Sequence, residues 1–266
     1  MEEIVLHDRL AVAPWMDPAL WRLPGVKPLD PDDWLIRDET FQAQMRLREH
    51  LIATRRDKVH ALTQTGRDAA GECLDLVLET LAGDTGYRLG NDRATRPDGA
   101  VVAIDRDQPL LTIGRLIQSD VCLMQEGAEG HVLTGAILCF PASWTLAEKI
   151  GRPLMAIHGP VPEYDSAVGM RVQRLFDAIR PDRPLWRANA VLHNDPSLFH
   201  PRSEHDPPSM RRGPPGGKYL RSERQTLRRL ARTGAVVFTI HTTVIEVDRL
   251  SDAQKAGLAG ITLKSG

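Results

Sequence analysis

The amino-acid sequence predicts an α+β protein in which helices and an N-terminal arm flank a mainly antiparallel sheet. Three observations support this fold class. The first forty residues are rich in Pro, Trp and Asp, a helical pattern follows from Thr40, and short runs of apolar and β-branched residues dominate from Ala100 onward. Because strands and helices do not alternate regularly, an antiparallel sheet is favoured over a parallel one.

The N-terminal arm is expected over residues 1–40, which include the stretch APWMDPALWRLPGVKPLDPDDWLIRDE. Each proline removes a backbone donor and restricts the residue before it, so this segment cannot sustain a regular ladder of strand hydrogen bonds. Trp15, Trp21 and Trp34 nevertheless offer large surfaces for burial. We expect the arm to pack on a single domain formed by residues 41–266.

Helices are expected in four segments of that domain. TFQAQMRLREHLIATRRDKVHAL starts at Thr40 with apolar residues near one stripe, and GRDAAGECLDLVLETLAGD shows helical spacing and ends at Gly83. Two later helices are expected at SWTLAEKIG, with Ser143 as N-cap, and at DSAVGMRVQRLFDAI, with Asp165 as N-cap.

Strands are expected in short runs separated by Gly, Pro and Asp, namely AVVAIDR, PLLTIGRL, SDVCLMQEG, HVLTGAILCFP, LWRANAVLH and GAVVFTIHTTVIEV. The segment CLMQEGAEGHVLTG predicts a hairpin with a Glu-Gly turn region. Residues 193–217 are polar and proline-rich, and a loop of this length is either mobile or part of a site.

Composition limits the class of protein and its partners. A hydrophobic fraction of 42% and a charged fraction of 26% are ordinary for a globular domain. With 34 Lys and Arg against 35 Asp and Glu, the formal net charge of −1 provides no general attraction to nucleic acid. No run of about 18 apolar residues predicts a membrane span. We therefore expect no nucleic-acid partner and no membrane partner.

The cysteines and the start of the chain bear on localisation. Cys73, Cys122 and Cys139 are odd in number, far apart and surrounded by apolar residues, so we expect buried free thiols, which fit a reducing compartment. The start, MEEIVLHDRLAVAPWMDP, lacks the basic and continuous apolar regions of a signal peptide. The expected localisation is cytoplasmic.

His158 is the first candidate for chemistry, because no phosphate-binding glycine loop, HExxH, CxxC or GxSxG is present. In MAIHGPVPEYDS, Pro160 and Pro162 restrict the backbone and Gly159 lets a planar group approach closely. A histidine without a second ligand suits heme better than zinc, because the porphyrin supplies four nitrogens itself. The alternative is a packed loop histidine bonded to a neighbouring carbonyl.

Charged residues in two other segments are further candidates. Arg187 lies between apolar residues in PLWRANAVLH, and its burial would require an anion, either an internal carboxylate or one on a ligand. Arg221, Glu223, Arg224 and Gln225 precede a strongly apolar strand, as either a solvated charged turn or a group that binds a carboxylate and holds a cation. Together with His158 they fit a bound planar dianion such as heme.

The order of several segments resembles that of a known family. These segments are LPGVKPLDPDDWLIRDETFQAQMRLREHLI, LIQSDVCLMQ, CFPASWTLAEKIGRPLMAIHGPVP, LWRAN and LRSERQTLRRLARTGAVVFTIHTTV. Together they resemble the heme-dependent oxidative N-demethylase alpha-subunit family over roughly residues 23–247. The most specific pieces are CFPASW, EKIG, IHGPVP and RSERQTL.

The resemblance implies a PAS-like heme domain that oxidatively removes a methyl group from a small secondary amine such as dimethylamine. The reaction would use O2 and yield formaldehyde and the primary amine. Electrons would come from NADPH through separate flavin and iron–sulfur subunits, of reductase and ferredoxin type. This chain has no cysteine cluster or dinucleotide fingerprint, so those partners would be other polypeptides.

Residue roles follow from the same resemblance. His158 of IHGPVP is expected to be the axial ligand of the heme iron, and Arg187 and Arg221 are expected to bind the cofactor. Arg224 is expected to line the distal pocket or to pair with a propionate, and Glu223 to orient a dimethylammonium ion. The sequence departs from the expected pattern at Ala190 and Ala231, and a change at Ala190 would reshape a pocket if it lined one.

Two alternatives to the enzyme remain open at this point. The first is a non-catalytic heme-binding sensor or carrier of the same fold, since fold does not dictate function. The second is a cofactor-free scaffold subunit, in which His158→Ala would leave the spectrum and partner binding unchanged.

Overall fold

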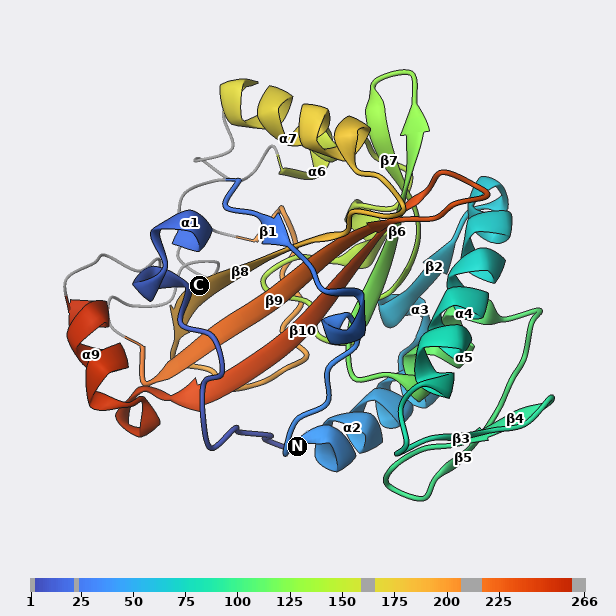
Figure 1. The fold of residues 1–266 in the computed structure, drawn as a ribbon. Helices are drawn as coiled ribbons and strands as arrows, with labels where there is room; N and C mark the ends of the chain where they lie inside the picture. The colour runs from blue at the N-terminus through green and yellow to red at the C-terminus, as the bar shows by residue number, and fades with distance from the viewer. Residues whose placement is uncertain (1–2, 22–23, 159–165, 207–216, 260–266) are drawn as a thin grey trace.

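A seven-stranded sheet forms the centre of the molecule in a computed structural model that describes residues 3–21, 24–158, 166–206 and 217–259. The strand order is β1-β8-β9-β10-β6-β7-β2, and each pairing between neighbours is antiparallel (Figure 1). A second sheet, with the order β3-β4-β5, lies beyond α5. The predicted α+β class with a mainly antiparallel sheet is confirmed.

The long strands of the central sheet are adjacent. Its members are β1 (Lys27–Pro28), β2 (His60–Leu62), β6 (Asp120–Gly127), β7 (Gly130–Ile137), β8 (Leu185–His193), β9 (Tyr219–Arg229) and β10 (Val236–Glu246). The small sheet contains β3 (Arg88–Leu89), β4 (Arg93–Thr95) and β5 (Val101–Ala103). The predicted hairpin is confirmed as β6–β7, where Gly127 pairs with Gly130 and Gly130 takes a φ of 98°.

The helices are α1 (Pro18–Trp21), α2 (Phe41–Thr54), α3 (Arg56–Val59), α4 (Arg67–Ala82), α5 (Pro109–Leu116), α6 (Leu154–His158), α7 (Ser166–Ala178) and α9 (Asp252–Ala259). The two helices expected after Thr40 and before Gly83 are therefore present as α2 and α4. No helix within the described ranges combines the length and apolarity that a membrane crossing requires.

Each face of the sheet has its own helices and its own core. On one face, α2, α4 and α5 pack against strand residues such as Leu123, Ile137 and Val237. On the other face, Leu154 of α6 and Phe176 of α7 pack against Met124, Ile240 and their neighbours (Figure 1). We call these the α2 face and the α6 face. Cys73, Cys122 and Cys139 are buried free thiols, as predicted.

Residues of the arm contribute to the core to different extents. The indole of Trp34 is 1% exposed and donates to the Thr226 hydroxyl at 3.1 Å. Trp15 is buried and donates to the carbonyl of Gln254. Trp21, in contrast, remains 37% exposed. The expected burial therefore holds for two of these three tryptophans.

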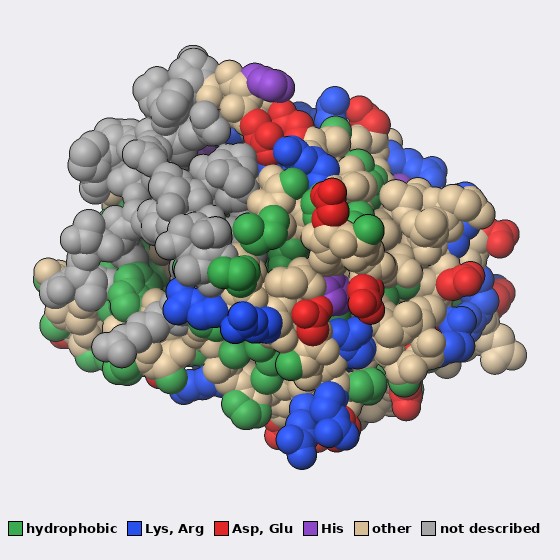
Figure 2. All heavy atoms as spheres, turned by 90° about the horizontal axis from the view of Figure 1, so that it is seen from above, with side chains coloured by type: hydrophobic (Ala, Val, Ile, Leu, Met, Phe, Trp, Pro, Cys, Tyr) green, Lys and Arg blue, Asp and Glu red, His purple; other side chains and the backbone are tan. Residues whose placement is uncertain are grey.

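The surface over α6 and α7 carries basic and acidic side chains interspersed with one another (Figure 2). Hydrophobic side chains are also exposed on this view. The mixture agrees with the near-balanced charge of the whole sequence.

Three predicted elements differ in the structure. PLLTIGRL forms α5 rather than a strand, since Pro109 fits the first helical turn and a short apolar run does not separate a buried helix from a strand. SWTLAEKIG forms only a 3-10 turn at Leu146–Glu148, and Ser143 takes a φ of 59°. The charged residues before GAVVFTIHTTVIEV do not form a solvated turn. They lie within β9, where Arg221 and Glu223 are buried. The expected cap Asp165 lies outside the described residues.

Candidate functional site

A polar cluster lies on the α6 face where β8, β9 and β10 run side by side. Arg187 pairs with Gln225 and Asn189 pairs with Glu223 across β8 and β9, and Gln225 pairs in turn with Ile240 of the α6-face core. Because directly paired residues point their side chains to the same face, these polar groups meet in the interior.

Glu223 is the carboxylate of this cluster. Its Oε2 accepts from Asn189 Nδ2 at 3.2 Å and from Gln225 Nε2 at 3.0 Å. The Oδ1 atom of Asn189 accepts from the backbone N–H of Glu223 at 3.2 Å, so Asn189 holds this residue at two points. The other carboxylate oxygen, Oε1, has a long contact of 3.4 Å to Arg221 Nε. The carboxylate is therefore oriented through Oε2 while Oε1 is weakly engaged.

Arg187 brings a cation with incomplete partners into the same cluster. Its Nη1 donates to Gln225 Oε1 at 2.8 Å, and its buried Nε has no hydrogen-bond partner among the described residues. Burial lowers the pKa of the guanidinium and the nearby charge of Glu223 opposes this change, but arginine keeps its charge in proteins. Gln225 thus links the Arg187 guanidinium to the Glu223 carboxylate, and the Nε of Arg187 can still donate a hydrogen bond.

Arg221 lies on the same face, but both of its Nη atoms donate to backbone carbonyls. Its Nη1 donates to the carbonyl of Leu198 at 3.1 Å and its Nη2 to the carbonyl of Phe140 at 2.5 Å. Burial lowers the pKa of this guanidinium while Glu223 opposes the shift. Arg221 therefore ties two loop segments to β9.

Arg224 is not brought together with the other predicted residues. Successive residues of a strand point to opposite faces, so Arg224 lies on the α2 face, where it pairs across the sheet with His241. Its Nη2 donates to the carbonyl of Asp33 at 2.7 Å, and its guanidinium lies 5.4 Å from the ring centre of Trp186. Its contacts fasten the arm to the sheet.

His158 is the last residue of α6, and its side chain lies outside the described part of the chain. The helix itself belongs to the α6 face, because Leu154 and Ile157 pack in the core of that face. Because Gln225 pairs with Ile240 of that same core, the backbone of His158 and the Glu223 cluster are on the same side of the sheet.

Three polar residues of the α6 face were missed by the sequence analysis: Asn189, His193 and Thr242. The buried hydroxyl of Thr242, opposite Glu223, has no partner among the described residues. His193 ends β8 on this face, and burial lowers the pKa of its imidazole to about 4, so the ring is neutral at neutral pH. A period-two reading of β8 would have grouped Asn189 and His193 with Arg187.

The comparison with protein families decides the relationship of the chain. A family described as "Haem-dependent oxidative N-demethylase, alpha subunit-like" matches residues 25–263. The chain belongs to this family. The resemblance inferred from CFPASW, EKIG, IHGPVP and RSERQTL is therefore confirmed.

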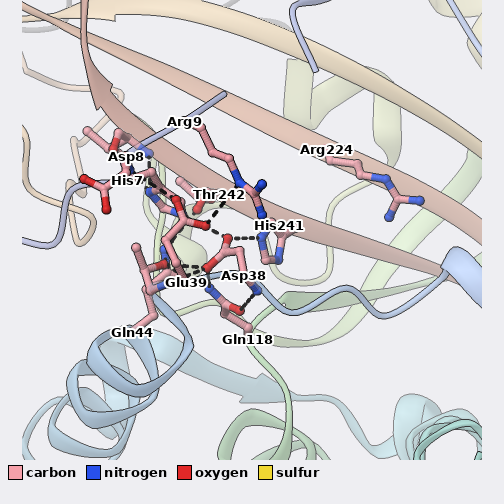
Figure 3. A network of polar contacts seen from close by, with 12 residues as sticks. His7, Asp8, Arg9, Asp38, Glu39, Gln44, Gln118, Arg224, His241 and Thr242 are labelled. Atoms are coloured by element: carbon pink, nitrogen blue, oxygen red, sulfur yellow. Dashed lines mark hydrogen bonds and ion pairs between the residues drawn. The ribbon is translucent and has the colours of Figure 1, made fainter. Parts of the chain in front are cut away.

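A second polar cluster lies on the α2 face, around Asp38 (Figure 3). Oδ2 of Asp38 accepts from Nε2 of His7 at 3.0 Å and from Nε2 of His241 at 2.8 Å. Oδ1 accepts from Gln118 Nε2 at 2.7 Å and from both the hydroxyl and the N–H of Thr40. Burial would raise the pKa of Asp38, but hydrogen bonds from His241 and His7 hold it far below its usual range.

Proposed function

We propose that this chain binds heme and oxidatively demethylates a small secondary amine of the dimethylamine type, with O2 as oxidant and formaldehyde and the primary amine as products. The observation that carries the proposal is the interior Arg187–Gln225–Glu223 arrangement in a member of this family. It offers a cation with spare donor capacity and a carboxylate with a weakly engaged oxygen on one sheet face.

A PAS-like domain is part of the proposal, with residues 1–40 as an arm on a domain of residues 41–266. The antiparallel order β7-β6-β10-β9-β8 supports it, with α6 and α7 in the connection between β7 and β8. Heme would lie against the α6 face, where Leu185, Leu227 and Ile240 provide apolar contacts.

The residues of this face fit a heme group. A buried Nε on a permanent cation is costly without an acceptor, and a heme propionate would supply one to Arg187. His158 would provide the axial ligand from the end of α6. When bound, heme supplies the one-electron and O2 chemistry that the side chains of this protein lack.

Glu223 would bind the substrate as a dimethylammonium ion. A cation entering an apolar interior requires an opposing charge, and Glu223 Oε1, with one long contact of 3.4 Å, would accept a hydrogen bond from the ammonium group. Asn189 and Gln225 would hold the carboxylate in the orientation that this contact needs. Because Gln225 lies between Arg187 and Glu223, Arg187 would bind a heme propionate while Glu223 binds the ammonium ion.

Electrons would come from NADPH through separate flavin and iron–sulfur subunits. The family's description as alpha subunit-like implies that other subunits exist. A cysteine-ligated iron–sulfur cluster takes four thiolates, whereas this sequence contains three cysteines, all of them buried and free. The buried thiols also support a reducing, cytoplasmic setting.

The visible spectrum of protein expressed with a heme precursor tests heme binding. Wild type should show a Soret band that His158→Ala abolishes or shifts. His193→Ala is the matched control, because His193 is a neutral imidazole on the same sheet face. A colourless wild type that takes up no added hemin would overturn the proposal. A Soret band altered by His193→Ala but not by His158→Ala would assign the iron ligand to His193 instead of His158.

Turnover is tested with the heme-loaded protein and a chemical reductant. Dimethylamine should increase O2 consumption and produce formaldehyde in equal amounts with methylamine. Heme binding without amine-dependent formaldehyde would instead favour a sensor or carrier.

A further inference from the structure

Lys149 is a buried lysine that contacts the helix carrying His158. It belongs to the EKIG segment and is 3% exposed. Its Nζ donates to the backbone carbonyl of Ile157 at 2.8 Å, and Ile157 directly precedes His158. The same Nζ forms an ion pair with Glu204.

Glu204 is itself held in place by the segment around Lys149. Its carboxylate accepts from Arg152 Nη1 at 3.2 Å, and its backbone N–H donates to the carboxylate of Glu148 at 3.1 Å. Ser203 adds a hydroxyl donation to Glu148 at 2.6 Å. The hydrogen bond from Lys149 lowers the pKa of Glu204, so this carboxylate is charged at neutral pH.

The carboxyl end of α6 needs a partner such as Lys149 Nζ for its last carbonyls. A five-residue helix has little stability of its own, and its last carbonyls lack partners within the helix. A cation at this end satisfies a carbonyl and complements the helix dipole. The N–H of Ile157 also donates to the carbonyl of Pro153 at 3.0 Å.

We propose that Lys149 is a positioning residue for His158: it anchors the carboxyl end of α6 to Glu204 and thereby fixes the backbone from which the iron ligand projects. The role in iron binding rests on the proposed function, whereas the anchoring of α6 does not. Partners that orient a metal ligand typically change metal affinity by about 10- to 100-fold when removed.

The first test uses the apoprotein and hydrogen exchange of backbone amides. Lys149→Met should accelerate exchange at Ile157 and its neighbours in α6 by about tenfold or more, because a hydrogen bond to a charged group is lost. Exchange in β9 and β10 should stay unchanged. Arg152→Gln is the matched control, because Arg152 binds the same Glu204 through a partly exposed side chain and makes no side-chain bond to α6 in the described contacts.

The second test titrates hemin into the same variants. Lys149→Met should weaken hemin binding by about tenfold or more and shift the Soret band, and Lys149→Arg should restore part of the affinity. Arg152→Gln should bind hemin as wild type does.

The outcomes separate the anchor from the proposed function. Faster exchange in α6 with no hemin binding even by wild type would sustain the anchor and remove the function. Unchanged exchange at Ile157, or equal acceleration across the whole sheet, would overturn the positioning role. Should Lys149→Met fail to fold, Lys149→Gln provides the same comparison with a shorter polar side chain.

Discussion

Asp38 and Glu223 are carboxylates on opposite faces of one sheet, and their partners differ in kind. Both oxygens of Asp38 are occupied, by two histidines on one side and by Gln118 and Thr40 on the other. Glu223 has two side-chain amides on Oε2 and one long contact on Oε1. Among the described residues, the nearby Arg187 has an unused donor at Nε, and His241 beside Asp38 has an unused ring atom at Nδ1.

On the proposed function, this difference separates a structural network from a ligand site. A carboxylate with a full set of donors gains nothing from a ligand, and its removal should destabilise the fold. A carboxylate and a cation with spare capacity gain from a ligand that supplies the missing partners. We therefore expect substitutions on the α6 face to change activity and those around Asp38 to change stability.

The largest expected effect is on turnover by Glu223→Gln. Removal of the charge that opposes a desolvated ammonium ion should lower kcat/KM for dimethylamine by about 1,000-fold. The measurement is formaldehyde production by heme-loaded protein. The Soret band should persist, which distinguishes loss of substrate binding from loss of heme, and turnover within tenfold of wild type would remove Glu223 from substrate binding.

Asp38→Asn should have the second largest effect, on stability. Loss of the charge that two histidines and Gln118 surround should lower the free energy of unfolding by about 2–3 kcal/mol, measured by urea denaturation. Activity per folded molecule should be unchanged. A variant as stable as wild type would show that this network contributes nothing to folding.

The same network predicts a pH dependence. The pKa of Asp38 is depressed in the folded state, so its contribution is present above the unfolded value of about 4 and is lost as pH falls further. Wild type should therefore lose stability below about pH 4 more steeply than Asp38→Asn. Parallel acid denaturation curves would show that Asp38 is not the group responsible.

Gln225→Leu should have a smaller effect, confined to the α6 face. It removes one oriented donor from Glu223 and the described acceptor of Arg187, so the KM for the amine should rise by about tenfold. Steady-state kinetics with varied dimethylamine provide the measurement. If kcat and KM both keep their wild-type values, Gln225 does not orient the carboxylate.

Arg224→Ala should have the smallest effect on activity and serves as the neighbouring control for Gln225→Leu. Its contacts are to Asp33, Trp34 and Trp186 on the α2 face, so only a modest loss of stability of about 1 kcal/mol is expected. A large loss of turnover would instead support the role in the distal pocket that the family resemblance suggested for Arg224.

Much of the fold could be predicted because it follows from local patterns. The β6–β7 hairpin, α2 and α4 each have a period or a turn signal of their own. The charged interior of β9 could not be recognised, because its polar side chains satisfy one another across strands and so replace the apolar alternation that normally indicates a strand. α5 was missed because it is short and nearly all of its residues are buried, so its apolar run resembles a strand.

The candidate site was predictable in part for similar reasons. Arg187 and Glu223 stood out as charges in apolar surroundings, but their connection through Gln225 depends on strand register. Ala190 was expected to affect a pocket, yet it packs with Leu10 and Trp15 in a separate core. The Asp38 network joins residues separated by up to about 200 positions, and no local pattern predicts such a meeting.

The most direct test of this account is a titration of heme-loaded protein with dimethylamine, followed through the Soret band, in wild type, Glu223→Gln and Asp38→Asn. The account predicts a saturable spectral change in wild type and in Asp38→Asn, and its loss in Glu223→Gln. A Glu223→Gln protein that responds to the amine as wild type does would contradict the assignment of the α6 face as the substrate site.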